Sequence, residues 1–154
     1  MARKLALDSS VLVKWFKKGE EFELEALRLR DEVLSSAVSV FACELMHLEV
    51  CRGLSKAGYS EQKIDEAYVA LREMSDFGFI RLVPVTDLKD KAKELIVKLN
   101  LYVADAISLA VAFTSHMDLL TEDRHLLKRE VKESLKKEGL KTIRLEELHG
   151  SDLA

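Results

Sequence analysis

The chain has 154 residues, of which 48% are apolar and 33% charged, and its formal net charge is −3. This length and composition suit one globular domain with a buried core. No apolar run reaches the roughly 18 residues that span a membrane, and the negative charge argues against broad, nonspecific nucleic-acid binding through a basic surface. A nuclease whose metal ions meet the phosphate remains compatible with this charge.

The first signal lies in residues 5–16, LALDSSVLVKWF. The apolar run Leu5–Leu7 predicts a strand that is buried on both faces. Asp8 ends this run, and residues 9–16 follow with an amphipathic helical pattern. Ligands of open α/β sheets bind outside the carboxyl ends of the strands, so Asp8 stands where a functional side chain is expected. Capping of the following helix is the alternative role of this aspartate.

The next segments alternate between helix and strand. Apolar spacing predicts helices over Glu20–Val33 and Phe41–Lys56. A further helix is predicted over Ser60–Phe77, with Ser60 as its N-cap and Gly78 directly after its end. Strands are predicted over Leu34–Val40 and Phe79–Val85. No internal repeat or linker interrupts this order, and we expect a single domain.

The second half continues the alternation. A charged helix is predicted over Asp87–Leu99 and a strongly apolar helix over Tyr102–Met117. Short strands are predicted over Asp118–Thr121 and Lys141–Leu145, and between them a helix rich in Lys and Glu starts at Asp123. Because hairpin signals are few, this order predicts parallel crossover units, and thus an α/β sandwich around a mostly parallel sheet of four to five strands.

Three aspartates stand where such a sheet brings side chains together. Asp8 follows the first strand, Asp123 follows the fourth, and Asp105 lies near the N-terminus of the apolar helix between them. The first two can face one crevice, and the helix can deliver the third from the side. Asp105 interrupts an apolar pattern, which is costly unless the carboxylate is paired or bound to a cation. Helix-dipole and capping roles are the structural alternatives.

The predicted third helix offers a fourth acid, and two glutamates compete for that position. Glu44 and Glu49 both have largely apolar helical neighbours, so periodicity does not separate them. The structural alternative for Glu49 is a surface ion pair with Arg52, three residues further along the helix.

Several carboxylates in one crevice repel one another unless a cation neutralises them. Oxygen ligands without a thiolate or a histidine cluster suit Mg²⁺ or Mn²⁺ rather than Zn²⁺. The reaction natural to such a site is attack of metal-activated water on a phosphodiester. His125, Lys14, Arg124, Lys128 and Arg129 can flank the crevice and position phosphates; a solvated helix face is the competing interpretation.

The cysteines, the N-terminus and the side-chain amides bear on the cellular location and the source of the protein. On one helix Cys43 and Cys51 would lie roughly 12 Å apart along the axis, beyond the reach of a disulfide, which predicts reduced thiols. The N-terminus lacks a signal peptide's longer apolar region and cleavage site, and we expect a cytoplasmic protein. Gln62 and Asn100 are the only side-chain amides beside abundant Lys and Glu, which favours a thermophilic source.

Four segments resemble the signature segments of PIN domains: LALDSSVLVKWF, ELMHLEVCRGL, YVADAISLAVA and LLTEDRHL. They occur in the family's order, and the resemblance covers nearly the whole chain. In length the chain is similar to VapC-type PIN proteins, the toxin ribonucleases of bacterial and archaeal toxin–antitoxin pairs. The resemblance implies a Rossmann-like three-layer α/β/α sandwich and a Mg²⁺- or Mn²⁺-dependent endoribonuclease.

Carried over by position, the resemblance implies four acids that both bind the metal and serve catalysis: Asp8, Glu49, Asp105 and Asp123. Asp105 matches the acid of the family's D-A motif, and Asp123 matches the Asp of T-x-D. Glu49 is preferred to Glu44 because Gly53-Leu54 follows it as the family's Gly-Leu follows its helix acid.

The resemblance also implies supporting residues and partners. Ser10 and Thr121 match two hydroxyls that support the hydrogen bonding of the site. The implied partners are an RNA substrate, a second copy of the chain in a homodimer, and a cognate antitoxin protein whose segment occludes the active site. Apolar stretches of the early helices are candidates for the groove that would receive it.

Other functions remain open beside the toxin. A PIN nuclease of ordinary RNA processing would use the same residues. A phosphatase of the haloacid dehalogenase type also starts from an aspartate after the first strand, but Ser10 stands where that family needs its second Asp. A non-catalytic binding domain that keeps the fold is the third alternative, and the complete acidic set argues against it.

Overall fold

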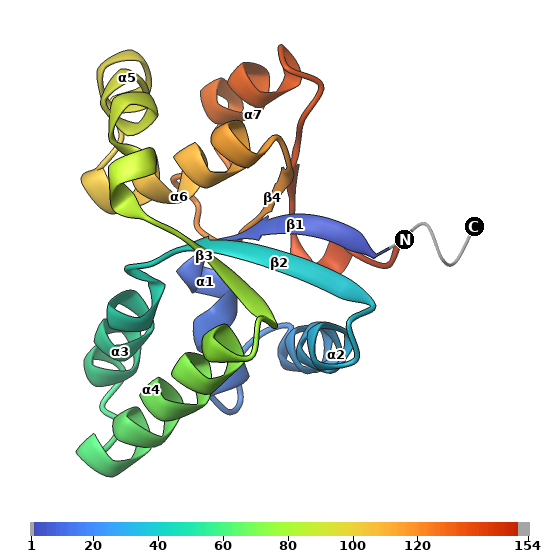
Figure 1. The fold of residues 1–154 in the computed structure, drawn as a ribbon, viewed down its shortest axis with the longest axis vertical. Helices are drawn as coiled ribbons and strands as arrows, with labels where there is room; N and C mark the ends of the chain where they lie inside the picture. Colours follow the sequence, from blue (N-terminus) through green and yellow to red (C-terminus); the bar gives the residue numbers. More distant parts are fainter. Residues whose placement is uncertain (1, 151–154) are drawn as a thin grey trace.

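The computed structural model describes residues 2–150 and places a five-stranded sheet between two layers of helices (Figure 1). The strands are β1 (Arg3–Leu7), β2 (Val38–Cys43), β3 (Ile80–Val83), β4 (Asp118–Leu120) and β5 (Thr142–Ile143). All four strand pairs are parallel, in the order β3-β2-β1-β4-β5. The three-layer α/β/α fold expected from the sequence is confirmed.

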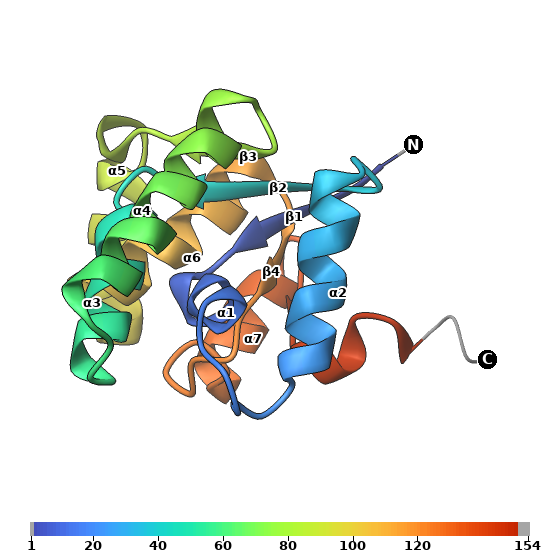
Figure 2. The same cartoon turned by 90° about the horizontal axis from the view of Figure 1, so that it is seen from below.

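The helices form two groups, one on each face of the sheet. They are α1 (Ser9–Leu12), α2 (Glu23–Leu34), α3 (Met46–Lys56), α4 (Glu61–Asp76), α5 (Lys89–Leu99), α6 (Val103–Ser115) and α7 (Arg129–Lys136), with short 3-10 turns η1 (Val13–Trp15), η2 (Val85–Asp87) and η3 (Leu145–Glu147). Helices α1 to α4 cover one face and α5 to α7 the other (Figure 1). Seen from below, α1 follows the tip of β1, with α2 on one side and α3 and α4 on the other (Figure 2).

Among the described residues, no single helix is long and apolar enough to cross a membrane. The pair α5 and α6 reaches that length and composition only when the two are taken together, and it is bent by 117° at its break.

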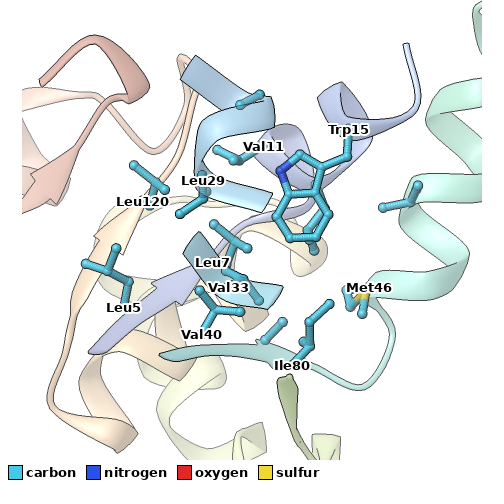
Figure 3. Packing of buried hydrophobic residues seen from close by; sticks show 14 of the residues in the cluster. Leu5, Leu7, Val11, Trp15, Leu29, Val33, Val40, Met46, Ile80 and Leu120 are labelled. Atoms are coloured by element: carbon cyan, nitrogen blue, oxygen red, sulfur yellow. The ribbon is translucent and has the colours of Figure 1, made fainter. Parts of the chain in front are cut away.

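The strand β1 lies in the middle of the sheet and contributes to a core on each face. Leu5 and Leu7 belong to the cluster on the α1–α4 side, and Ala6 belongs to the cluster on the α5–α7 side. The apolar residues Leu5–Leu7 are therefore buried between the two cores, whereas Arg3 and Lys4 at the start of the strand are exposed. Trp15 is 5% exposed and lies in the first cluster near Met46 (Figure 3), so it is a core residue.

The sheet order sets where a site can form. From β1 the chain builds β2 and β3 on one side, and then crosses over to build β4 and β5 on the other. The side chains beyond β1 and β4 therefore border the switch point at which ligands of open α/β sheets bind. The Asp8 N–H donates to the Leu120 carbonyl at 3.1 Å, which extends the β1–β4 ladder into this region.

The predicted strand Leu34–Val40 and the predicted helix Phe41–Lys56 are both displaced in the structure. The strand occupies Val38–Cys43 instead, and the helix begins only at Met46. Ser36 has a φ of 65°, in the left-handed region, and separates the preceding helix from this strand. The buried Val38 and Val40 alternate with the half-buried Ser39 and Phe41, but the run Phe41–Cys43 is apolar without interruption and so resembles the start of a buried helix.

Predicted helix starts were right at one place and wrong at another. Ser60 caps α4 as expected, since its hydroxyl accepts the Lys63 N–H at 3.3 Å. The helix predicted from Asp123 begins only at Arg129. The Asp123 carboxylate accepts the His125 N–H at 2.7 Å and so stabilises a local turn in place of the first helical residues.

Candidate active site

Asp8 lies at the carboxyl end of β1 and also caps α1. Its backbone is extended, with φ −86° and ψ 151°. Its Oδ2 accepts the Ser10 N–H at 3.3 Å, the Ser10 hydroxyl at 2.6 Å and the Thr121 hydroxyl at 3.0 Å. The residue is 4% exposed and lines a surface cleft. Capping and a position in the cleft are therefore compatible, because the capping bonds use Oδ2 and leave Oδ1 for a ligand.

The hydroxyls of Ser10 and Thr121 tie the start of α1 to the loop after β4. The Ser10 oxygen accepts the Glu122 N–H at 3.0 Å, and the Thr121 oxygen accepts the Asp123 N–H at 3.0 Å. The two oxygens lie 3.3 Å apart, and each directs its proton to Asp8. The structure thus places both predicted supporting residues where they orient Asp8 and the backbone of Asp123.

The loop that carries Asp123 is anchored from its other side by Glu122. This side chain is 7% exposed, pairs with Arg144 at 2.9 Å and accepts the Leu145 N–H at 2.9 Å. The Arg144 guanidinium in turn lies 5.4 Å from the centre of the Phe22 ring. Sequence reasoning missed this pair, because its members are 22 residues apart and belong to no shared motif.

Helix α3 delivers Glu49 to the same cleft through a close contact at Gly53. A Cβ atom added there would lie 3.1 Å from the Val13 side chain, so glycine permits the tight approach of α3 to η1. Glu44, in contrast, is exposed ahead of α3 and accepts the Val85 N–H at 2.9 Å. The structure therefore brings Glu49 to the cleft and fixes Glu44 elsewhere.

One cleft of about 610 Å³ contains the four predicted acids together: Asp8, Glu49, Asp105 and Asp123. They come from β1, α3, α6 and the loop after β4. Arg52 and Lys56 line the same cleft from α3. Sequence reasoning treated Arg52 only as a partner of Glu49 and overlooked Lys56, although both follow Glu49 at spacings that share one helix face.

The charge of Glu49 is unfavourable in this position. Burial, and then the negative charges of Asp8 and Asp105, raise its pKa to about 7, while a hydrogen bond from Ser9 opposes the shift. Burial and the neighbouring carboxylates thus make the charged form of Glu49 costly, and a bound cation would offset this cost.

Asp105 shows the same effect. Burial, followed by repulsion from Asp123 and Asp8, raises its pKa to about 6, and His125 opposes the shift in part. A hydrogen bond with Asp123 favours the protonated form further. The two carboxylates are therefore close enough to compete for one proton.

This donor set fits a hard divalent cation. It offers only carboxylate oxygens, which Mg²⁺ and Mn²⁺ prefer, and its mutual repulsion is the condition that a bound cation relieves. Among residues 2–150, however, no three His, Cys, Asp or Glu side chains converge closely enough to form a complete metal-binding group as they stand. The acids surround the cleft without closing on one point.

The predicted flanking cations do not act as a group. Lys14 pairs with a glutamate of the following loop, and Arg129 pairs with a glutamate one turn later on α7. Arg124 is exposed. Lys128 and His125 line a smaller pocket that adjoins the acidic cleft. The interpretation as a solvated helix face thus holds for Arg129, whereas the Lys14 side chain is largely buried in its ion pair.

Comparisons with known proteins identify the fold and the family of this chain. The family model described as the PIN domain matches residues 5–132. Among solved structures, the fold is similar to a toxin–antitoxin complex from Klebsiella pneumoniae, with TM-score 0.58, 19% identity, and coverage of 82% of this chain and 92% of that chain. It is also similar to a protein of Pyrobaculum aerophilum, with TM-score 0.53, 18% identity and 90% of each chain covered. A search of curated proteins gives no significant match.

At these identities the solved structures establish the fold alone, whereas the family match runs from β1 into α7 and so includes all four acids of the cleft. The chain belongs to the PIN domain family, whose members are generally nucleases.

Proposed function

We propose that this protein is a Mg²⁺- or Mn²⁺-dependent endoribonuclease that acts in the cytoplasm as a single PIN domain, and that it is the toxin of a VapBC-type pair. The observation that carries the nuclease proposal is the cleft where four acids from separate elements meet. Burial and neighbouring charges raise the pKa of both Glu49 and Asp105 there, which supports a need for a cation. A PIN nuclease of RNA processing is the alternative that shares this site.

In this proposal Asp8, Glu49, Asp105 and Asp123 hold the cation. The bound ion would neutralise charge on the scissile phosphate and activate the attacking water. Asp8 enters the reaction already oriented, because its Oδ2 is held by two hydroxyls and an N–H. Glu49 orients the attacking water, and the side chains of Arg52 and Lys56 bind the phosphates that flank the cut.

An antitoxin is the proposed protein partner. The Klebsiella pneumoniae structure, described as a toxin–antitoxin complex, supports this assignment through its similar fold. An apolar groove of about 390 Å³ lies between η1, α2 and α4, with Trp15, Phe16, Met74 and Phe77 among its walls, and Phe77 is 77% exposed. Co-expression with the product of a small adjacent gene tests the proposal: a stable complex is expected, and Phe77→Asp should weaken it without changing cleavage by the free protein.

A homodimer is the remaining part of the proposal. Three large apolar side chains stay mostly exposed on α3, α5 and α6: Leu48, Val97 and Val103. Their burial in a second copy would remove this apolar surface from water. Light scattering at several concentrations gives the mass in solution; a monomer at all of them contradicts the dimer.

The nuclease proposal is tested by cleavage of a structured RNA with Mn²⁺, with Mg²⁺ and with a chelator. Metal-dependent cutting should vanish in Asp105→Asn and persist in Asp90→Asn, which changes an exposed aspartate in the first turn of α5. Equal cutting by wild type and Asp105→Asn would indicate a contaminating ribonuclease. Hydrolysis of para-nitrophenyl phosphate without RNA cleavage would favour the phosphatase, and a total lack of metal effects would favour the binding domain.

A further inference from the structure

A second pocket of about 240 Å³ adjoins the acidic cleft, and apart from Asp105 and His125 its residues have no role in the site described so far. It is lined by Asn100, Leu101, Tyr102, Asp105, His125 and Lys128. One wall is the connection between α5 and α6, and the other is the turn ahead of α7. Asp105 lines both this pocket and the acidic cleft, so a molecule in the pocket lies directly beside the place where RNA would be cut.

Tyr102 is the most unusual residue of this pocket. Its side chain is 73% exposed although it precedes the most buried helix of the protein. The ring makes an edge-to-face contact with His125, with centroids 5.7 Å apart and planes at 84°. The contact sets the Tyr102 ring against His125, and its exposed fraction leaves most of the ring accessible to a ligand. An exposed, oriented aromatic face is the surface on which an unstacked nucleic-acid base binds.

Polar groups surround this ring on the sides where a nucleotide carries its own polar atoms. Lys128 is exposed, lines the pocket and forms no ion pair among the described residues. Asn100 lines it with a side-chain amide, which offers both a donor and an acceptor to a base edge. The ring nitrogens of His125 complete the set.

We propose that this pocket is a nucleotide subsite, which binds the RNA nucleotide next to the scissile phosphate. Tyr102 stacks on its base, Lys128 and His125 contact its phosphate, and Asn100 contacts the edge of the base. The proposal rests on the proposed function, because Asp105 joins the subsite to the cleft in which cleavage takes place. It makes this pocket a determinant of which RNA sites are cut.

Binding can be tested without catalysis. Backbone amide spectra would be recorded while adenosine or uridine monophosphate is added in the presence of a chelator. The largest shifts are expected around Asn100–Tyr102 and around His125–Lys128. Tyr102→Ala should weaken binding about tenfold, since base–aromatic stacking is worth roughly 1–3 kcal/mol. The matched control is Val69→Ala, which changes an exposed side chain of α4 outside the pocket and should bind as wild type does. Shifts confined to other surfaces, or no shifts, would overturn the proposal.

Cleavage kinetics separate this subsite from the catalytic proposal. On an RNA whose cut site has been mapped, Tyr102→Ala should raise KM about tenfold and lower kcat less, while Tyr102→Phe should stay near wild type because it keeps the ring. Asn100→Gly should change base preference. Glycine is chosen because Asn100 has φ 52° and ψ 47°, a left-handed conformation that alanine tolerates poorly. Two RNAs would each carry one abasic nucleotide, placed directly before or directly after the cut. Only one of them should reproduce, with the wild-type protein, the rise in KM expected for Tyr102→Ala.

The outcomes of these experiments are distinguishable. Cleavage with equal KM in wild type and Tyr102→Ala would overturn the subsite and leave the nuclease intact. Monophosphate binding at Tyr102 without cleavage of any RNA would contradict the nuclease proposal and would support the nucleotide site alone. A change in oligomeric state of Tyr102→Ala, with an unchanged monophosphate titration, would assign the ring to a protein interface and overturn the proposal.

Discussion

Thr121 donates a hydrogen bond of 3.0 Å to Asp8 across a separation of 113 residues in the chain. The threonine is fully buried and the aspartate is 4% exposed, so water competes little for this contact. The same threonine oxygen accepts the Asp123 N–H at 3.0 Å. One hydroxyl therefore links two of the four acids of the cleft and fixes their relative position.

Replacing this hydroxyl tests the link. Thr121→Val keeps the shape of the side chain but removes the donor to Asp8 and the acceptor for the Asp123 N–H. The free energy of unfolding should fall by about 1.5–3 kcal/mol, the range typical of hydrogen bonds to charged groups. Thr142→Val is the matched control, because the Thr142 hydroxyl is buried without a hydrogen-bond partner among the described residues. Urea unfolding should show a loss for the first variant only, and equal stabilities would contradict the role given to Thr121.

The ion pair between Glu122 and Arg144 leads to a second prediction. Glu122→Gln removes the buried charge opposite Arg144 and should loosen the loop that presents Asp123. We expect kcat for RNA cleavage to fall several-fold while KM changes little, because no residue lining the cleft is altered. Glu146→Gln removes the other, more exposed partner of Arg144 and should leave kcat near wild type. A similar fall of kcat in both variants would contradict the specific role given to Glu122 in holding the loop.

The pKa of Glu49 predicts how stability depends on pH without metal. Its pKa is 4.5 in an unfolded chain and is raised to about 7 in the fold. Between these values the folded state binds more protons, so the free energy of unfolding should decrease as pH rises through this window. Glu49→Gln should melt at a higher temperature than wild type at pH 8 in a chelator, and the gap should narrow toward pH 5. Glu44→Gln should melt at the same temperature as wild type at both pH values. A wild-type melting temperature that rises from pH 5 to pH 8 would contradict the prediction.

Metal binding should become stronger as pH rises. A cation competes with protons for Glu49 and Asp105, whose pKa values are raised to about 7 and about 6. Adding Mn²⁺ should therefore raise the melting temperature more at pH 8 than at pH 5. An equal rise at both pH values would indicate that the ion binds elsewhere.

The positions of Asp8 and Asp123 in the cleft could be predicted from the sequence, because both follow strands and the carboxyl ends of parallel strands share one edge. The position of Glu49 could not be derived from periodicity, since Glu44 has equally apolar neighbours. It depends on where α3 begins and on the contact of Gly53 with Val13, which is a tertiary contact.

Two kinds of error arose from local rules. The second half of Val38–Cys43 is an uninterrupted apolar run, so it was predicted as the start of a helix. Basic residues close in sequence to the acids were considered as flanking the crevice, beside their interpretation as a solvated helix face, and Lys14 instead forms an ion pair outside the cleft. Arg52 and Lys56 were missed as residues that line the cleft, because their place depends on the face that α3 turns to the cleft.

If Glu49 and its three aspartate neighbours hold a divalent cation, the ion should bind in the absence of RNA. A titration of Mn²⁺ against purified protein, followed by electron paramagnetic resonance of the free ion, measures this binding. Wild type and Glu44→Gln should bind Mn²⁺ with the same affinity, and Glu49→Gln should bind it at least tenfold more weakly at pH 8. Equal affinity of Glu49→Gln and wild type would show that Glu49 is not a ligand of the ion.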